Sequence, residues 1–150
     1  MLIIDYQSSS YQRFLQDLKR HVSHPKRFLI IFNGANTTDL AKAMEDVETY
    51  SGKLLQLTSA IAEQETGVND LFTEAKKSQS ILLFTKADIA LGKSVAVKNS
   101  HALEADFDLN NFFKNIANHK GMVILASEKA QTLSAALSSK VDVNLRFTSK

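Results

Sequence analysis

The chain has 150 residues, of which 44% are hydrophobic and 23% are charged, and its 18 basic side chains nearly balance its 16 acidic ones. This length and composition fit one folded domain over residues 1–150 and exclude a wholly disordered chain. Balanced charge argues against a dedicated nucleic-acid binder, and the absence of cysteine excludes disulfides and thiolate chemistry. Because no apolar run approaches the ~20 residues of a membrane span, we expect a cytoplasmic protein without a membrane anchor.

The first third of the chain predicts a helix, a strand and a second helix. Apolar side chains three and four residues apart predict an amphipathic helix over residues 8–22. Residues 27–32 are rich in strand formers, and Pro25 separates them from that helix. We expect Thr37 or Thr38 to be the N-cap of the next helix.

Strands and helices alternate through the rest of the chain. We expect further strands over residues 54–58, 80–84, 122–126 and 141–147, with helices that begin near residues 68, 108 and 132. This alternation is typical of a parallel sheet with right-handed crossovers. We therefore predict an α/β three-layer sandwich, with a five-stranded parallel sheet in a core that spans residues 27–147.

A polar corner follows the predicted strand 80–84. It contains residues 85–88 (Thr-Lys-Ala-Asp) and then residues 91–93 (Leu-Gly-Lys). This order resembles AAA+ ATPase domains, where a strand ends in Asp-Glu-Ala-Asp before an apolar-Gly-Lys segment. Residues 121–128 resemble the strand that follows in the same family. The resemblance extends over residues 71–147 and implies a P-loop NTPase-like fold.

One further segment points to a group within that family. Residues 97–101 (Val-Lys-Asn-Ser-His) resemble a loop of the AAA+ proteins found beside contractile injection and phage-tail-like systems. This resemblance implies a place in a larger assembly. The partners that it implies are copies of the chain itself, an active ATPase or other components of the assembly.

The phosphate-binding loop of the family is altered here. Its pattern is Gly-x-x-x-x-Gly-Lys-Thr/Ser, whose backbone N–H groups surround the phosphates. The corresponding stretch comprises Gly34, Ala35, Asn36, Thr37 and Thr38, and it lacks the second glycine and the lysine. On this alignment it is also about three residues shorter.

The remaining chemical positions are altered as well. Thr85 and Lys86 stand where the family has the acidic pair that holds magnesium, and a lysine there opposes the metal. For Asp88 we favour a cap at a strand end or a salt-bridge partner over a metal ligand. Glu128 replaces the polar sensor residue of the family and would oppose a γ-phosphate. We therefore expect no catalytic residue, metal site or cofactor, and no helical lid domain.

A basic patch surrounds the single proline. It consists of Lys19, Arg20, Lys26 and Arg27. Such a patch predicts a contact with nucleic acid or an acidic partner, although cations at the end of a helix account for it equally well.

The altered motifs predict a catalytically inactive AAA+-like domain, a pseudo-ATPase rather than an enzyme. We expect it to act as a structural or regulatory protein-interaction module that binds a protein partner or itself, within an injection-system or similar assembly. Two alternatives stay open. One is a nucleotide-binding ATPase subunit completed in trans by a partner, and the other is a small regulator of a DNA-associated AAA+ complex.

Overall fold

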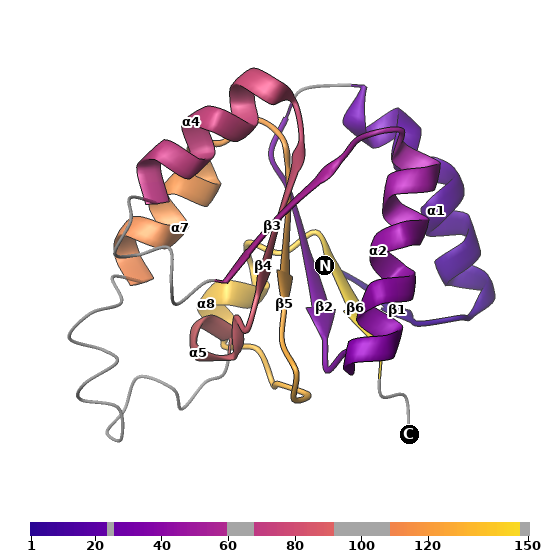
Figure 1. Ribbon diagram of the computed structural model, residues 1–150. Coiled ribbons are helices and arrows are strands. Elements are labelled where there is room, and N and C mark those ends of the chain that lie inside the picture. The colour runs from indigo at the N-terminus through magenta and orange to yellow at the C-terminus, as the bar shows by residue number, and fades with distance from the viewer. Residues whose placement is uncertain (24–25, 60–67, 92–108, 148–150) are drawn as a thin grey trace.

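A parallel sheet forms the middle layer of the protein, with helices on both faces (Figure 1). The computed structural model describes residues 1–23, 26–59, 68–91 and 109–147. Within these ranges the strands are β1 Leu2–Asp5, β2 Phe28–Asn33, β3 Leu55–Ser59, β4 Ile81–Thr85, β5 Met122–Ala126 and β6 Val143–Arg146. The helices are α1 Ser9–Val22, α2 Thr37–Ser51, α4 Val68–Ser78, α5 Asp88–Leu91, α7 Leu109–Asn118 and α8 Ala135–Ser138. Residues 97–101, which resemble the injection-system loop, lie outside the described ranges.

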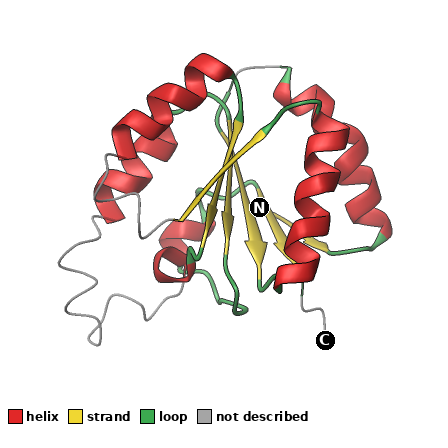
Figure 2. Ribbon diagram, in the orientation of Figure 1, coloured by secondary structure: helices red, strands yellow, loops and turns green. Residues whose placement is uncertain are grey.

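The sheet has the strand order β1-β6-β2-β5-β4-β3, and every neighbouring pair is parallel (Figure 2). The predicted parallel α/β sandwich is confirmed, but the expected number of five strands is wrong because the described sheet has six. The additional strand is β1, which pairs only with β6 at one edge. Leu2 and Ile3 are more than half exposed there, so β1 lacks the long apolar run by which buried strands are recognised.

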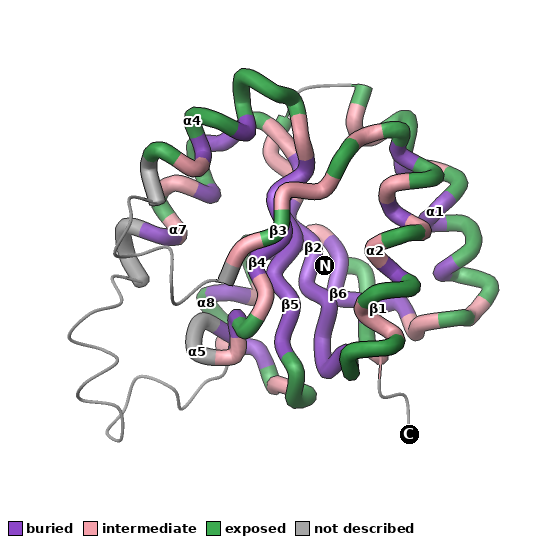
Figure 3. The backbone as a smooth tube through the Cα atoms, in the orientation of Figure 1, coloured by how far each residue is buried: buried purple, intermediate pink, exposed green. Residues whose placement is uncertain are grey.

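Strand β2 shows how the two cores are filled. Leu29 and Ile31 belong to the core beneath α4 and α7, whereas Ile30 and Phe32 belong to the core beneath α1 and α2. Successive side chains on a strand point to opposite faces, so a strand that is apolar at every position requires a cover on both sides. Figure 3 shows the resulting band of buried residues through the centre of the sheet.

Helix α2 begins one residue earlier than a threonine cap would allow. The N-cap is Asn36, whose side-chain oxygen accepts a hydrogen bond from the N–H of Asp39 at 2.8 Å. The expectation of Thr37 or Thr38 as the cap is therefore wrong, because asparagine is among the strongest N-cap residues and its extended backbone leaves both threonines inside the first turn. Within the described ranges no helix is long and apolar enough to cross a membrane.

His119 lies just beyond the C-terminal end of α7, at the amino edge of the sheet, and is only 7% exposed. Its ring packs edge-on against Phe72, with 5.3 Å between ring centroids. Burial lowers the pKa of His119 below its ordinary value, and the positive charge of Lys76 lowers that pKa further. The imidazole is therefore held in its neutral form by the folded structure.

This pKa difference predicts a pH dependence of stability. Near pH 6.5, the ordinary pKa of histidine, the unfolded chain binds a proton that folded His119 does not, so the free energy of unfolding should fall as pH drops through this value. The fall should end once the pH passes the lower folded-state pKa. Urea unfolding at a series of pH values measures this. His119→Phe, which keeps a ring, should flatten the dependence, and identical pH profiles for the two proteins would contradict the assignment.

Candidate functional site

The carboxyl ends of β2, β4 and β5 meet at one edge of the sheet because β5 lies between the other two and all three are parallel. The positions selected from the sequence lie at the ends of these strands, with Gly34 to Thr38 after β2, Thr85 at the end of β4 with Lys86 and Asp88 after it, and Glu128 after β5. The fold thus brings all of them to the same edge. Ligands of open parallel sheets bind at this edge.

The connection from β2 to α2 consists of Gly34, Ala35 and Asn36, and its backbone is bound to the chain that follows β5. The N–H of Gly34 donates to Oγ of Ser127 at 3.0 Å, and the N–H of Ala35 donates to the carbonyl oxygen of Ser127 at 3.0 Å. Ser127 is buried and in turn donates its own N–H to the carbonyl oxygen of Phe32 at 3.0 Å. Two of the N–H groups that a phosphate-binding loop would offer are therefore already occupied.

Gly34 also sits directly against this segment. Its φ is +78°, and a Cβ placed on it would lie 3.2 Å from both Cα and N of Ala130. Left-handed backbone of this kind favours glycine, and a side chain here would require Ala130 to move by a few tenths of an ångström. The chain after β5 therefore fills the space over the corner after β2.

Asn33, at the end of β2, ties the same segment to the sheet. Its Nδ2 donates to the carbonyl oxygen of Gln131 at 3.0 Å and to Oδ1 of Asn144 at 3.3 Å, while its Oδ1 accepts the N–H of Gln131 at 2.8 Å. Asn33 and Asn144 are both buried. Sequence analysis missed Asn33 and Ser127, although a polar residue directly at the end of an apolar strand was a signal that could have identified each.

Asp88 binds the other side of this segment. Its Oδ1 accepts the N–H of Glu128 at 3.0 Å, and its Oδ2 accepts the N–H of Lys129 and Nε2 of Gln131, each at 3.1 Å. The Asp88 carboxylate thus caps the loop after β5, although Glu128 in that loop is 40 residues further along the chain. Among the described residues no group of three or more histidines or acids could hold a metal ion.

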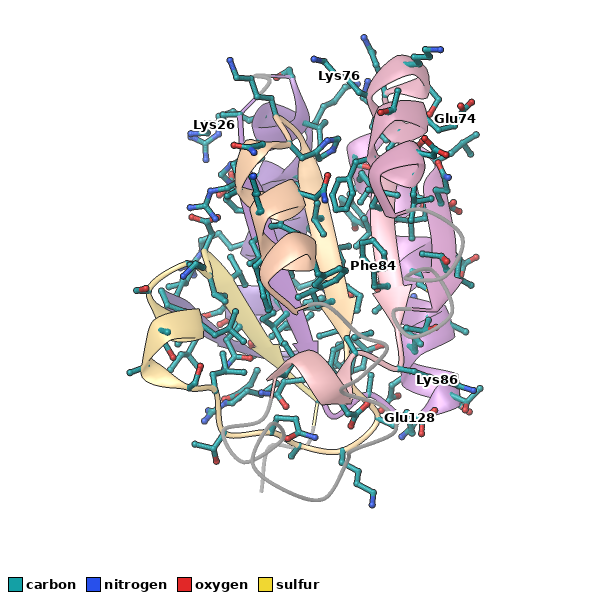
Figure 4. All side chains as sticks on the ribbon, turned by 90° about the vertical axis from the view of Figure 1, so that its left-hand side faces the viewer. Lys26, Glu74, Lys76, Phe84, Lys86 and Glu128 are labelled. Carbon is teal, nitrogen blue, oxygen red and sulfur yellow. The ribbon has the colours of Figure 1, made fainter. Side chains whose placement is uncertain are left out.

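Thr85, Lys86 and Glu128 complete the edge without converging on a common point. Oγ1 of Thr85 donates to the carbonyl oxygen of Thr58 at 3.2 Å, so this hydroxyl is directed towards β3. Lys86 has a φ of +53° and is exposed, as is Glu128, and Figure 4 shows both at this end of the molecule. Neither forms an ion pair with the described part of the chain.

The N-terminus of α2 presents a negative charge to this edge. Asp39 lies in the first turn, and Nδ2 of Asn36 donates to its Oδ2 at 3.1 Å. Thr37 and Thr38 are exposed on the same turn. A carboxylate near a helix N-terminus offsets the positive end of the helix dipole, so this terminus attracts an anion less than a bare one would.

In the structure, the two arginines of the predicted basic patch bind other parts of the chain, and its two lysines do not form ion pairs with the described residues. Arg20 pairs with Asp17 at 3.3 Å, and Nη1 of Arg27 donates to the carbonyl oxygen of Lys140 at 2.8 Å. Lys19 is exposed on α1. Lys26 lies at the end of the sheet opposite to Lys86 (Figure 4). The patch is therefore separate from the carboxyl edge.

Gly34 provides a test of the packing over this corner. We expect Gly34→Ala to lower the free energy of unfolding by about 1–2 kcal/mol for the left-handed backbone, plus the cost of displacing Ala130. Gly52→Ala is the matched control, since Gly52 has a φ of +74° but no atom within 4 Å of the added Cβ. Urea unfolding measures both, and equal losses would show that Ala130 does not press on Gly34.

Asp88 provides a test of the loop after β5. We expect Asp88→Ala to lower the free energy of unfolding by about 2–3 kcal/mol, because it leaves the N–H groups of Glu128 and Lys129 without their acceptor. Glu128→Ala removes an exposed carboxylate nearby and should change the same quantity by no more than about 0.5 kcal/mol. A similar small loss for both variants in chemical denaturation would refute the capping role.

Comparison with known proteins agrees with this topology. A family model described as ATPase family associated with various cellular activities (AAA) matches residues 35–149. A chain in the HORMA:CdnC:Trip13 complex of E. coli MS115-1 has a similar fold, with a TM-score of 0.59 and 19% identity over 97% of this chain and 63% of that chain. PCH-2 of C. elegans has a TM-score of 0.55 and 14% identity over 97% of this chain and 44% of that chain.

No curated protein sequence matches the chain. The chain spans less than two thirds of the length of each of the two similar structures. Their low identity establishes the fold alone, whereas the family model covers most of the sequence, including residues 35–38 after β2 and the segments after β4 and β5. On this evidence the chain belongs to the AAA family, the ATPases associated with various cellular activities.

Proposed function

We propose that this chain is an AAA-family domain that does not hydrolyse ATP and that works as a structural or regulatory protein-interaction module. The observation that carries the proposal is the contact of Ser127 and Ala130 with the corner after β2. A phosphate would need backbone N–H groups at this corner, and those of Gly34 and Ala35 are bound to Ser127. Nucleotide would therefore have to displace part of the protein.

The charges at the neighbouring strand ends support the same proposal. Magnesium-assisted phosphoryl transfer needs carboxylates that hold the metal. Lys86 is exposed where an acid would be required, and Asp88 uses both carboxylate oxygens to hold the loop after β5. A metal ion would meet a positive charge at one position and an engaged ligand at the other.

Exposed apolar side chains at both edges of the sheet favour a role in protein contacts. Leu2 and Ile3 are 58% and 52% exposed on β1, and Leu57 is 52% exposed on β3. Sheet edges with exposed apolar side chains are common sites of association. One of the similar structures is itself a complex of HORMA, CdnC and Trip13 proteins.

The setting that we propose rests on the sequence. Residues 97–101 resemble a loop of the AAA+ group found beside contractile injection systems, which favours a place in an assembly of that kind. The absence of cysteine fits a reducing compartment, and we place the module in the cytoplasm.

Isothermal titration calorimetry with ATP and ADP tests the proposal that the chain does not bind nucleotide. With magnesium present, we expect neither ATP nor ADP to bind with micromolar affinity, because the phosphate position is occupied by the chain itself. Magnesium-dependent micromolar binding would overturn the proposal. ATP turnover measured over rising protein concentration adds a second arm, since turnover that increases steeply with concentration would support a site completed in trans by another copy.

A further inference from the structure

The opposite, amino edge of the sheet contains a cavity of about 450 Å³. Its walls come from the C-terminal ends of α1 and α4, the residues after α7, and the first residues of β2, β4 and β5. Figure 4 places Lys26 and Lys76, which line it, at the end of the molecule away from Lys86 and Glu128. The volume lies within the range of about 300–1,000 Å³ that is usual for ligand pockets.

Positive charge surrounds this cavity. The lysines that line it are Lys26, Lys53, Lys76 and Lys120. No acid is among the described residues of the wall, and none of these lysines forms an ion pair within the described ranges. Lys53 alone has a side-chain partner, the amide oxygen of Gln79 at 3.3 Å. The acids that act on His21 in the same wall are engaged elsewhere, since Asp17 pairs with Arg20 and Asp142 accepts the N–H of Leu29. A cluster of lysines without ion-pair partners attracts anionic groups.

The nearby acid on α4 does not neutralise the cluster. Glu74 and Lys76 are two positions apart, which on a helix places their side chains about 200° apart. Figure 4 shows them on opposite sides of α4. Compensation of the helix dipole accounts for Lys76, which lies in the last turn of α4. It accounts less well for Lys26 and Lys120, because both lie in connections outside the helices.

His119 adds a buried polar group to the cavity wall. The residue is 7% exposed, and neither ring nitrogen makes a hydrogen bond with the described part of the chain. Gly121 allows the ring to lie against the backbone, since a Cβ at Gly121 would be 2.8 Å from Nε2 of His119. The ring nitrogens are not among the fully buried unpaired atoms, so they are reached from the cavity and can bond to water or to a ligand there.

The deeper wall of the cavity is apolar. It includes Val22, Phe28, Ile81 and Met122. Phe28 stacks on His21 with 4.5 Å between ring centroids and 21° between planes. The rings of His21 and Phe28 each have one face covered by the other. A nucleic-acid base could therefore not insert between them without breaking this stack. An apolar wall beneath a basic rim suits an apolar side chain flanked by carboxylates.

We propose that this cavity binds an acidic peptide segment of a protein partner, with an apolar side chain on the wall of Val22, Ile81 and Met122 and flanking carboxylates at the lysine rim. The N–H of His119 donates to a carbonyl or carboxylate oxygen of the segment. This assignment rests on the proposed interaction module and names the chemistry of its partner.

Fluorescence anisotropy tests the assignment with the whole chain and a defined probe. The probe is a fluorescein-labelled peptide in which one leucine is flanked on both sides by glutamates. We expect it to bind, with an affinity that falls as salt is added, and we expect the same peptide with glutamines in place of glutamates to bind much more weakly. A single-stranded oligothymidylate of equal charge should also bind more weakly than the acidic peptide.

Variants locate the binding. Reversing two charges of the rim, Lys76→Glu with Lys120→Glu, should weaken binding of the acidic peptide about tenfold. Lys114→Glu with Lys129→Glu makes the same change in net charge at exposed lysines that do not line the cavity, and it should have little effect. His119→Phe keeps the ring but removes its N–H, so it should weaken binding severalfold while circular dichroism shows a folded chain.

Three results would overturn the assignment. They are no binding of the acidic peptide, equal losses from the rim variant and its control, and tighter binding of the oligothymidylate than of the peptide. Nucleotide calorimetry remains a separate test. If ATP binds with micromolar affinity and the peptide also binds, the proposal of an inactive module is wrong and the assignment of the cavity stands. If only the peptide fails to bind, the assignment of the cavity alone is wrong.

Discussion

Hydrogen bonds between the chain after β5 and the corner after β2 determine what the carboxyl edge of this sheet can do. The N–H groups of Gly34 and Ala35 both donate hydrogen bonds to Ser127, which is buried. Removing an acceptor from a buried N–H costs about 1–3 kcal/mol, so a ligand at this corner must replace each bond that it breaks. Asp88 and Asn33 hold the same segment from two further sides. The corner is therefore stabilised as a closed structure.

The two ends of the sheet differ in how their polar groups are used. At the carboxyl edge, Asn33, Asp88 and Ser127 direct their hydrogen bonds to other parts of the chain. At the amino edge, the lysines around the cavity have no carboxylate partners within the described ranges, and the ring of His119 makes no hydrogen bond with the described part of the chain. This contrast places the groups still free for binding at the end away from the nucleotide position of the family.

The core of this AAA-family fold does not depend on the residues at its carboxyl edge. Two apolar layers, one on each face of β2, are formed by alternate side chains of the strands and by the helices that cover them. Lys86 and Glu128 are exposed at strand ends and contribute nothing to these layers. The fold therefore does not require particular residues at these two positions.

The sequence by itself determined the order of helices and strands, because periods of 2 and 3.6 residues report local burial on the faces of each element. The parallel arrangement predicted from that order implies that residues directly after the strands share one edge, since parallel strands have their carboxyl ends on the same side. Sequence analysis missed β1, whose pairing with β6 joins opposite ends of the chain. The contact of Ser127 and Ala130 with Gly34, and the convergence of Lys26, Lys53, Lys76 and Lys120, were decided only by the tertiary structure. These groups lie far apart in the sequence, and local periodicity carries no information about which of them the packed layers bring together.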